Sequence, residues 1–263
     1  MRMTRVLDNK QCYQIERKIQ NVFLKHSGIK FLSLESEESE NYDKVFYFNK
    51  IFTLEKNLDR LKNNNIKFYI DLDIIISKDG VDYLNDLNDY IPVGNIYYIN
   101  WEYTNLLHLK KIFPKEYYRV ILDLVKTHKR YSTMLIPINI LDEFFEFLNK
   151  INYKKLVEKY YNQYLEEFLY SIFIHKKRLD YLKNYDKELV YNLYLRKIDM
   201  FNDKGDDTFY NVSYYHLTTS GILSYFDKII QRYPEYKKER NKLKRLIQDL
   251  SLTKKYKKIK KRS

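Results

Sequence analysis

Residues 66–77 of the chain, IKFYIDLDIIIS, decide the fold that we expect. The apolar, aromatic and β-branched residues of this stretch lie between NNN at 63–65 and KDG at 78–80, and both triplets are typical of turns. The pattern therefore predicts one buried β-strand that contains two acids. Asp71 and Asp73 are separated by a single residue, so on one strand they would project from the same face.

Two carboxylates in a buried strand predict a metal site. Burying two ionised groups so close together is costly unless a cation or another partner compensates them. Hard oxygen ligands suit Mg²⁺ or Mn²⁺, which take one or two protein carboxylates and complete their shell with substrate phosphates. A second interpretation stays open, in which the strand ends near Ile70 and both acids are solvated or cap the next segment. The return of apolar residues at 74–76 favours the continuous strand.

The composition indicates a folded protein in a reducing compartment. Of the 263 residues 44% are hydrophobic, which is enough for a sizeable core in one large domain or two small ones. Cys12 is the single cysteine, which excludes an intramolecular disulfide, and no Cys/His cluster has zinc spacing. The sequence contains neither an apolar run long enough to cross a bilayer nor a signal-peptide core. We therefore expect a cytoplasmic protein, or one peripheral at the inner face of a membrane.

The positive charge is concentrated at the C-terminal end. The formal net charge is +13, and residues 232–263 hold 14 Lys or Arg and 3 Asp or Glu, a balance of +11 that leaves +2 for the rest. The polybasic tail at 254–262, KKYKKIKKR, suits an anionic membrane surface or nucleic acid, although a plain solubilising end is an equally open interpretation. The nearly neutral body does not indicate a nucleic-acid groove.

Strand and helix patterns alternate up to about residue 140, and helical patterns continue to about residue 201. We expect helices at 7–25, 53–61 with Thr53 as the cap, 81–87, and 104–129 with a break at Pro114. Strands are expected at 29–34, 66–77, 95–101 and 131–138, and Asn139 is expected to cap the helix that follows. Residues 3–7 look too polar for a first strand, so 29–34 is expected to take that place.

This order predicts an α/β fold with a mixed, mostly parallel sheet flanked by helices and a helical C-terminal part. We expect residues 1–140 to form an α/β nucleotide-binding region and 141–231 a mostly helical acceptor-side region. Residues 232–263 are expected to form a basic C-terminal helix and tail. Ligands of such sheets bind beyond the carboxyl ends of the strands, where the strand order switches.

The segment FYIDLDIIISKDGVDYLNDL at 68–87 resembles the Asp-x-Asp (DXD) segment of nucleotide-sugar glycosyltransferases with the GT-A fold. In those families a helix, a strand, Asp-x-Asp, an apolar run and a short helix follow in this order. Residues 131–148 resemble the segment in which such enzymes place an acceptor-side strand followed by a helix. Residues 163–174 resemble the acidic helix that follows in several bacterial capsule and lipopolysaccharide transferases. The resemblance covers about residues 45–175. It implies an enzyme that moves a sugar from a nucleotide diphosphate sugar donor to a glycan or lipid-linked acceptor.

The resemblance also implies a metal site for the diphosphate of the sugar donor. Asp73 and Asp71 would bind Mn²⁺ or Mg²⁺, and this ion would bridge the diphosphate, so that Asp71 is also part of the nucleotide site. His216, in YYHLTTSG, corresponds to a late histidine that some of these families use as an additional cation ligand. The plainer interpretation of His216 is an ordinary loop histidine.

Three further residues have possible roles beside plainer interpretations. Glu166 and Glu167 occupy the family position of the general base that an inverting enzyme needs, while a Glu pair on an amphipathic helix commonly forms its solvated face. Trp101 follows an expected strand, where it could stack on a base or a sugar or simply pack.

Two other classes of protein stay open. Primases of the archaeal and eukaryotic type also carry two aspartates in an apolar strand, where they hold the metals for nucleotide transfer. Their later Ser-x-His has only an imperfect counterpart here, Thr127-His128, and no third acid is obvious. The other class is a non-enzymatic nucleic-acid-binding protein that acts through its basic tail.

Overall fold

A computed structural model describes residues 1–7, 11–36, 48–72, 74–76, 81, 113–126, 131, 133, 135–160, 165–184, 209–211, 227, 230–231 and 234–260. The chain divides into two compact units. The first unit consists of residues 1–35, 70–86 and 200–263, and the second unit of residues 36–69 and 87–199. Each unit thus combines segments that are distant in the sequence.

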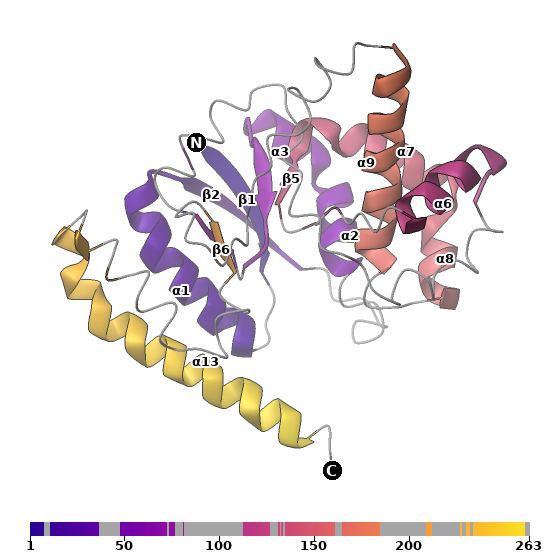
Figure 1. Ribbon diagram of the computed structural model, residues 1–263. Coiled ribbons are helices and arrows are strands. Elements are labelled where there is room, and N and C mark those ends of the chain that lie inside the picture. Colours follow the sequence, from indigo (N-terminus) through magenta and orange to yellow (C-terminus); the bar gives the residue numbers. More distant parts are fainter. Residues whose placement is uncertain are drawn as a thin grey trace. The chain divides into compact units, whose positions relative to one another are not determined.

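The first unit opens with a β–α–β arrangement (Figure 1). Strands β1 (Arg2–Leu7) and β2 (Lys30–Glu35) pair in parallel, and α1 (Gln11–Ser27) connects them. Gly28 follows the helix with a φ of 70°, a left-handed conformation that glycine adopts without strain. The helix predicted at 7–25 and the strand predicted at 29–34 are confirmed, apart from small shifts of their ends.

Strand β1 corrects the prediction that residues 3–7 are too polar for a strand. Thr4 is fully buried, and its hydroxyl donates to the carbonyl oxygen of Leu32 at 2.8 Å. Arg5 is also buried, and its guanidinium donates to three side-chain oxygens. Buried polar groups are tolerated when they are hydrogen-bonded. Counting apolar residues therefore missed this strand.

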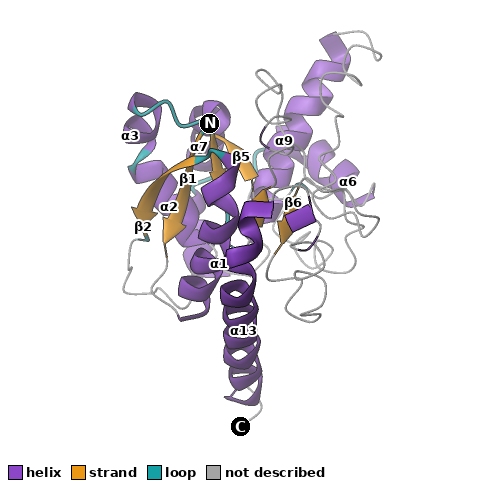
Figure 2. Cartoon of the chain, turned by 90° about the vertical axis from the view of Figure 1, so that its left-hand side faces the viewer, coloured by secondary structure: helices purple, strands orange, loops and turns teal. Residues whose placement is uncertain are grey.

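Helix α13 (Arg240–Lys260) lies alongside α1 within the first unit, as Figures 1 and 2 both show. Leu243, Ile247 and Leu250 are fully buried at spacings of four and three residues, which is the pattern of an amphipathic helix face. A 3₁₀ helix, Pro234–Glu239, precedes α13. Strand β4 (Ile74–Ile76) pairs antiparallel with β6 (Phe209–Asn211) in a two-stranded sheet.

The described part of the second unit is mostly helical. Helix α9 (Leu165–Asn184) packs against α6 (Tyr118–Lys126) and α7 (Leu141–Lys150). The ring of Phe144 lies edge-on to that of Tyr170 with centroids 5.4 Å apart, an arrangement that stabilises pairs of aromatic rings. The other described elements are α2 (Asn49–Lys56), α3 (Leu58–Asn63), α8 (Tyr153–Tyr160), strand β5 (Leu135–Pro137), and the 3₁₀ turns Lys115–Tyr117 and Ile138–Ile140.

A four-stranded sheet has the order β2-β1-β3-β5, where β3 is Phe68–Ile70, and it is mixed and mostly parallel. Together with the helices, this sheet confirms the α/β class. Strand β1 has β2 on one side and β3 on the other, so the strand order switches direction at β1.

The prediction of a single strand over 66–77 is wrong. Strand β3 ends at Ile70, β4 begins at Ile74, and the two strands belong to different sheets. Between them the N–H of Ile74 donates to the carbonyl oxygen of Asp71 at 3.2 Å, as in a β-turn. The interpretation in which the strand ends near Ile70 is thus the correct one for the backbone. Both halves of the stretch are apolar, so hydrophobicity alone did not reveal the break.

Two predicted helix caps are also wrong. Thr53 lies inside α2, where its hydroxyl donates to the carbonyl oxygen of Asn49 at 2.7 Å. Asn139 lies within a 3₁₀ turn, and Ile140 at the start of α7 makes no side-chain capping bond. The strand expected at 95–101 lies outside the described residues, as does all of the helix expected at 81–87 except Val81. Of the helices that the structure describes, none combines the length and the apolar character needed to cross a membrane.

Candidate functional site

The first candidate site is the turn that carries Asp71. Asp71 directly follows the carboxyl end of β3, and its side chain is partly exposed. The side chain of the next residue, Leu72, is buried. Asp73 lies outside the described residues. The carboxylate of Asp71 is therefore at the end of a strand in the sheet, the position at which ligands of α/β proteins bind.

A glutamine of α1 holds the backbone of this turn. Gln20 is fully buried, and its Nε2 donates to the carbonyl oxygen of Asp71 at 2.9 Å and to that of Ile74 at 2.7 Å. These two carbonyls are the first and last of the turn, so one amide group joins its two ends. A side chain from the helix between β1 and β2 thus holds the backbone at Asp71 and at Ile74.

Arg5 of β1 fixes the orientation of that glutamine. Its Nη1 donates to Gln20 Oε1 at 2.9 Å and to Asn21 Oδ1 at 2.8 Å, and its Nε donates to Ser33 Oγ at 3.1 Å. A guanidinium can only donate, so the atom of Gln20 that faces it is the amide oxygen, and the NH₂ group faces the turn. Arg5, Gln20 and the two turn carbonyls form a relay, which we call the Arg5–Gln20 relay.

The Arg5 guanidinium is held in an unusual environment. Its carbon lies 4.8 Å from the ring centroid of Phe31, and the partners named above are all neutral. Burial, with a smaller contribution from Arg17, lowers the pKa of Arg5 to about 10. Five N–H groups in a rigid plane suit this arrangement, because they can satisfy several acceptors at once.

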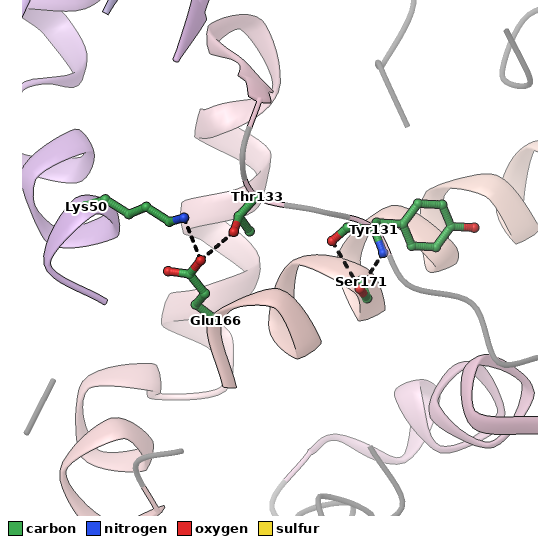
Figure 3. Close-up of polar contacts among 5 residues, drawn as sticks. All are labelled: Lys50, Tyr131, Thr133, Glu166 and Ser171. Atoms are coloured by element: carbon green, nitrogen blue, oxygen red, sulfur yellow. Dashed lines mark hydrogen bonds and ion pairs between the residues drawn. The ribbon is translucent and has the colours of Figure 1, made fainter. Parts of the chain in front are cut away.

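The second candidate site lies on α9 in the second unit (Figure 3). Glu166 and Glu167 are only 4% and 7% exposed, so the interpretation that they form a solvated helix face is wrong. Glu166 Oε1 lies 2.6 Å from Lys50 Nζ, and the hydroxyl of Thr133 donates to the same oxygen. A buried carboxylate with a cation and a hydroxyl donor is held in one orientation.

Two further residues of the same helix, Ser171 and His175, make polar contacts with Tyr131, which precedes β5. The N–H of Tyr131 donates to Ser171 Oγ at 2.9 Å, as Figure 3 shows. One turn further along, His175 lies between Tyr131 and Asp123. Its Nδ1 is 3.3 Å from the Tyr131 hydroxyl, and its Nε2 is 2.6 Å from Asp123 Oδ2. These contacts fix the segment that carries Thr133.

The predicted site residues that the structure describes belong to two different units. Asp71 belongs to the first unit, and Glu166 and Glu167 belong to the second unit. Trp101 and His216, like Asp73, lie outside the described residues. Within the described residues, no group of three or more His, Cys, Asp or Glu side chains is arranged to hold a metal ion.

Sequence reasoning missed the residues that support these sites. A signal for Arg5 and Gln20 was present in the sequence, because both are polar residues within apolar patterns. Gln20, for example, follows Ile19 on the buried face of α1. Lys50 and Thr133 carry no comparable signal, because their partner Glu166 is distant in the sequence.

Comparison with known proteins finds no family model, no curated protein and no solved structure that matches this chain. The resemblance to GT-A glycosyltransferases therefore stays a prediction.

Proposed function

We propose that this protein is a metal-dependent glycosyltransferase of the GT-A type, which moves a sugar from a nucleotide diphosphate sugar to a glycan or lipid-linked acceptor. The observation that carries the proposal is the position of Asp71. It follows β3, the neighbour of the strand at which the sheet order switches, and its turn is held by the Arg5–Gln20 relay. Switch points of this kind are where α/β proteins bind nucleotides.

The residues of the turn fit a hard divalent cation. Gln20 holds the carbonyl oxygens of Asp71 and Ile74, and the Asp71 carboxylate supplies oxygen atoms of the kind that hard cations prefer. Mg²⁺ and Mn²⁺ need only one or two protein carboxylates when phosphates supply further ligands. Asp71 and Asp73 would hold the ion, with His216 as a further ligand and Trp101 stacked on the nucleotide. A bound cation would offset the charge that develops on the departing diphosphate.

The two glutamates of α9 are the proposed source of the general base. Their burial supports a specific role, because acidic side chains are rarely buried unless they are paired. Lys50 and Thr133 hold Glu166 in one orientation, which is what a base needs to meet an acceptor hydroxyl. Glu167 is the neighbouring alternative.

A thermal-shift measurement tests the donor site. Uridine or guanosine diphosphate should raise the melting temperature only in the presence of Mn²⁺, because a ligand that binds the folded state stabilises it. The effect should be lost in Asp71→Asn and in Asp73→Asn. It should persist in Asp59→Asn, which removes an exposed acid of α3. A shift that is absent, or that is independent of Mn²⁺ and of Asp71, would overturn the proposal.

Turnover separates the base from the metal ligands. Glu166→Gln or Glu167→Gln should keep the Mn²⁺-dependent shift and lose roughly 10²- to 10⁴-fold in sugar transfer, the usual contribution of a general base. If the protein instead adds nucleotides to a template strand with the same dependence on Asp71, the primase alternative is correct. If only deletion of residues 254–262 changes ligand binding, the protein acts through its basic tail.

A further inference from the structure

The apolar face that packs the first half of α13 does not continue in the sequence of its second half. Leu243, Ile247 and Leu250 pack on α1 at spacings of four and three residues. The next positions of the same series are 254, 257 and 261, and all three are lysine. The helix nevertheless continues to Lys260. The apolar series that packs on α1 therefore gives way to lysine after Leu250, while the helical backbone continues.

A second apolar stripe begins where the first one ends. Leu252 is 65% exposed, and Tyr256 and Ile259 follow it at spacings of four and three residues. Residues advance by about 100° around an α-helix, so this stripe lies on the side opposite to Leu243 and Leu250. It thus faces away from the direction in which the first half of the helix is anchored. The spacing of these three residues on the helical backbone is that of an amphipathic segment, and Leu252, whose side chain is described, is exposed.

Asp249, three residues before Leu252, is the last acid of α13, and the charged residues after it are all positive. Residues 251–263 contain seven Lys or Arg and no Asp or Glu. A helix with an apolar stripe bordered by lysines is typical of segments that lie in the interface of a membrane. Anionic lipid head groups attract such lysines, and the apolar side chains enter the boundary with the acyl chains.

We propose that residues 251–260 of α13 form a docking surface for an anionic membrane, with Leu252, Tyr256 and Ile259 inserted and the lysines of this segment on the head groups. A nucleic acid would use the lysines, but its phosphate backbone offers no partner for an apolar stripe at helical spacing. The stripe therefore favours the membrane. The proposal goes beyond the glycosyltransferase assignment and does not rest on it.

Co-sedimentation of the full chain with vesicles tests the proposal. The protein should bind vesicles that contain phosphatidylserine and should not bind vesicles of pure phosphatidylcholine. Raising the ionic strength from ~0.1 M to ~0.5 M should weaken binding severalfold, because salt screens the lysines. Leu252→Ser with Ile259→Ser should lower the partition coefficient by about tenfold or more, because two apolar side chains no longer enter the membrane.

The controls separate the stripe from general stickiness and from charge alone. Leu122→Ser removes the other large exposed hydrophobic side chain among the described residues, which is 48% exposed on α6, and should leave vesicle binding unchanged. Failure to bind the acidic vesicles would overturn the proposal. Unchanged binding by the Leu252→Ser and Ile259→Ser variant, together with lysine-dependent binding of single-stranded RNA or DNA, would identify a nucleic-acid surface instead.

Discussion

The Arg5–Gln20 relay makes a direct prediction about stability. Gln20→Leu keeps the volume of the side chain but removes three hydrogen bonds, two to the turn carbonyls and one from Arg5. Each such bond contributes about 1 kcal/mol, and a buried group left without its partner costs about 1–3 kcal/mol. Asp71 keeps the N–H of Ile74 as a donor to its carbonyl oxygen. The free energy of unfolding should therefore fall by about 2–4 kcal/mol.

Urea unfolding followed by circular dichroism measures this loss, because the free energy depends linearly on denaturant concentration. Gln248→Leu, at an exposed glutamine of α13, is the matched control and should stay within about 0.5 kcal/mol of the parent protein. Arg5→Met combined with Gln20→Leu should cost about 1–2 kcal/mol less than the sum of the single changes, since both partners are then gone. A Gln20→Leu protein as stable as the Gln248→Leu control would refute the relay.

The same variant links the relay to the proposed donor site. If Gln20 holds the Asp71 turn, Gln20→Leu should weaken the Mn²⁺-dependent shift with uridine diphosphate at temperatures where the protein is still folded. A purely structural glutamine would lower the starting melting temperature and leave the increment caused by the ligand unchanged.

Further predictions concern single side chains. Tyr170→Phe should stabilise the protein or leave its stability unchanged, because the buried Tyr170 hydroxyl has no hydrogen-bond partner among the described residues. Tyr153→Phe should lower the free energy of unfolding by about 1 kcal/mol, because the Tyr153 hydroxyl donates to Glu55 Oε2 at 2.6 Å. Burial raises the pKa of both phenols, so the free energy of unfolding should fall as the pH rises above about 10, and each Tyr→Phe change should reduce that fall in pH-dependent urea titrations. Leu243→Ala should cost about 2–5 kcal/mol by leaving a cavity against α1 in the same assay. Lys50→Met should cost about 3–5 kcal/mol, because it leaves the carboxylate that it pairs with buried without its cation.

Local patterns in the sequence predicted several elements correctly. Helix α1 shows the spacing of Ile15, Ile19 and Val22, and Ser27-Gly28 marks its end. Strand β2 and the α/β class also follow from patterns within a few residues. These features depend on periodicity and turn chemistry, which operate between near neighbours.

The break in the strand at Asp71 could not be predicted from such local patterns. The apolar residues before and after the acids are alike, yet the first belong to β3 and the last to β4 in another sheet. Gln20, which is 51 residues away from Asp71, donates to the carbonyl oxygens on both sides of the break. Hydrophobicity reports that residues are buried and does not report against which strand they pair.

The glutamates of α9 and the polar residues of β1 show the same limit. Glu166 is buried because Lys50, 116 positions earlier, lies beside it, and Arg5 is buried because α1 and β2 surround it with acceptors. The sequence by itself determined the α/β class, helix α1, strand β2 and the concentration of charge at the C-terminal end. Only the tertiary structure decided where the strand at Asp71 ends and which polar side chains are buried, because both depend on partners that are distant in the chain and supply hydrogen bonds no local pattern encodes.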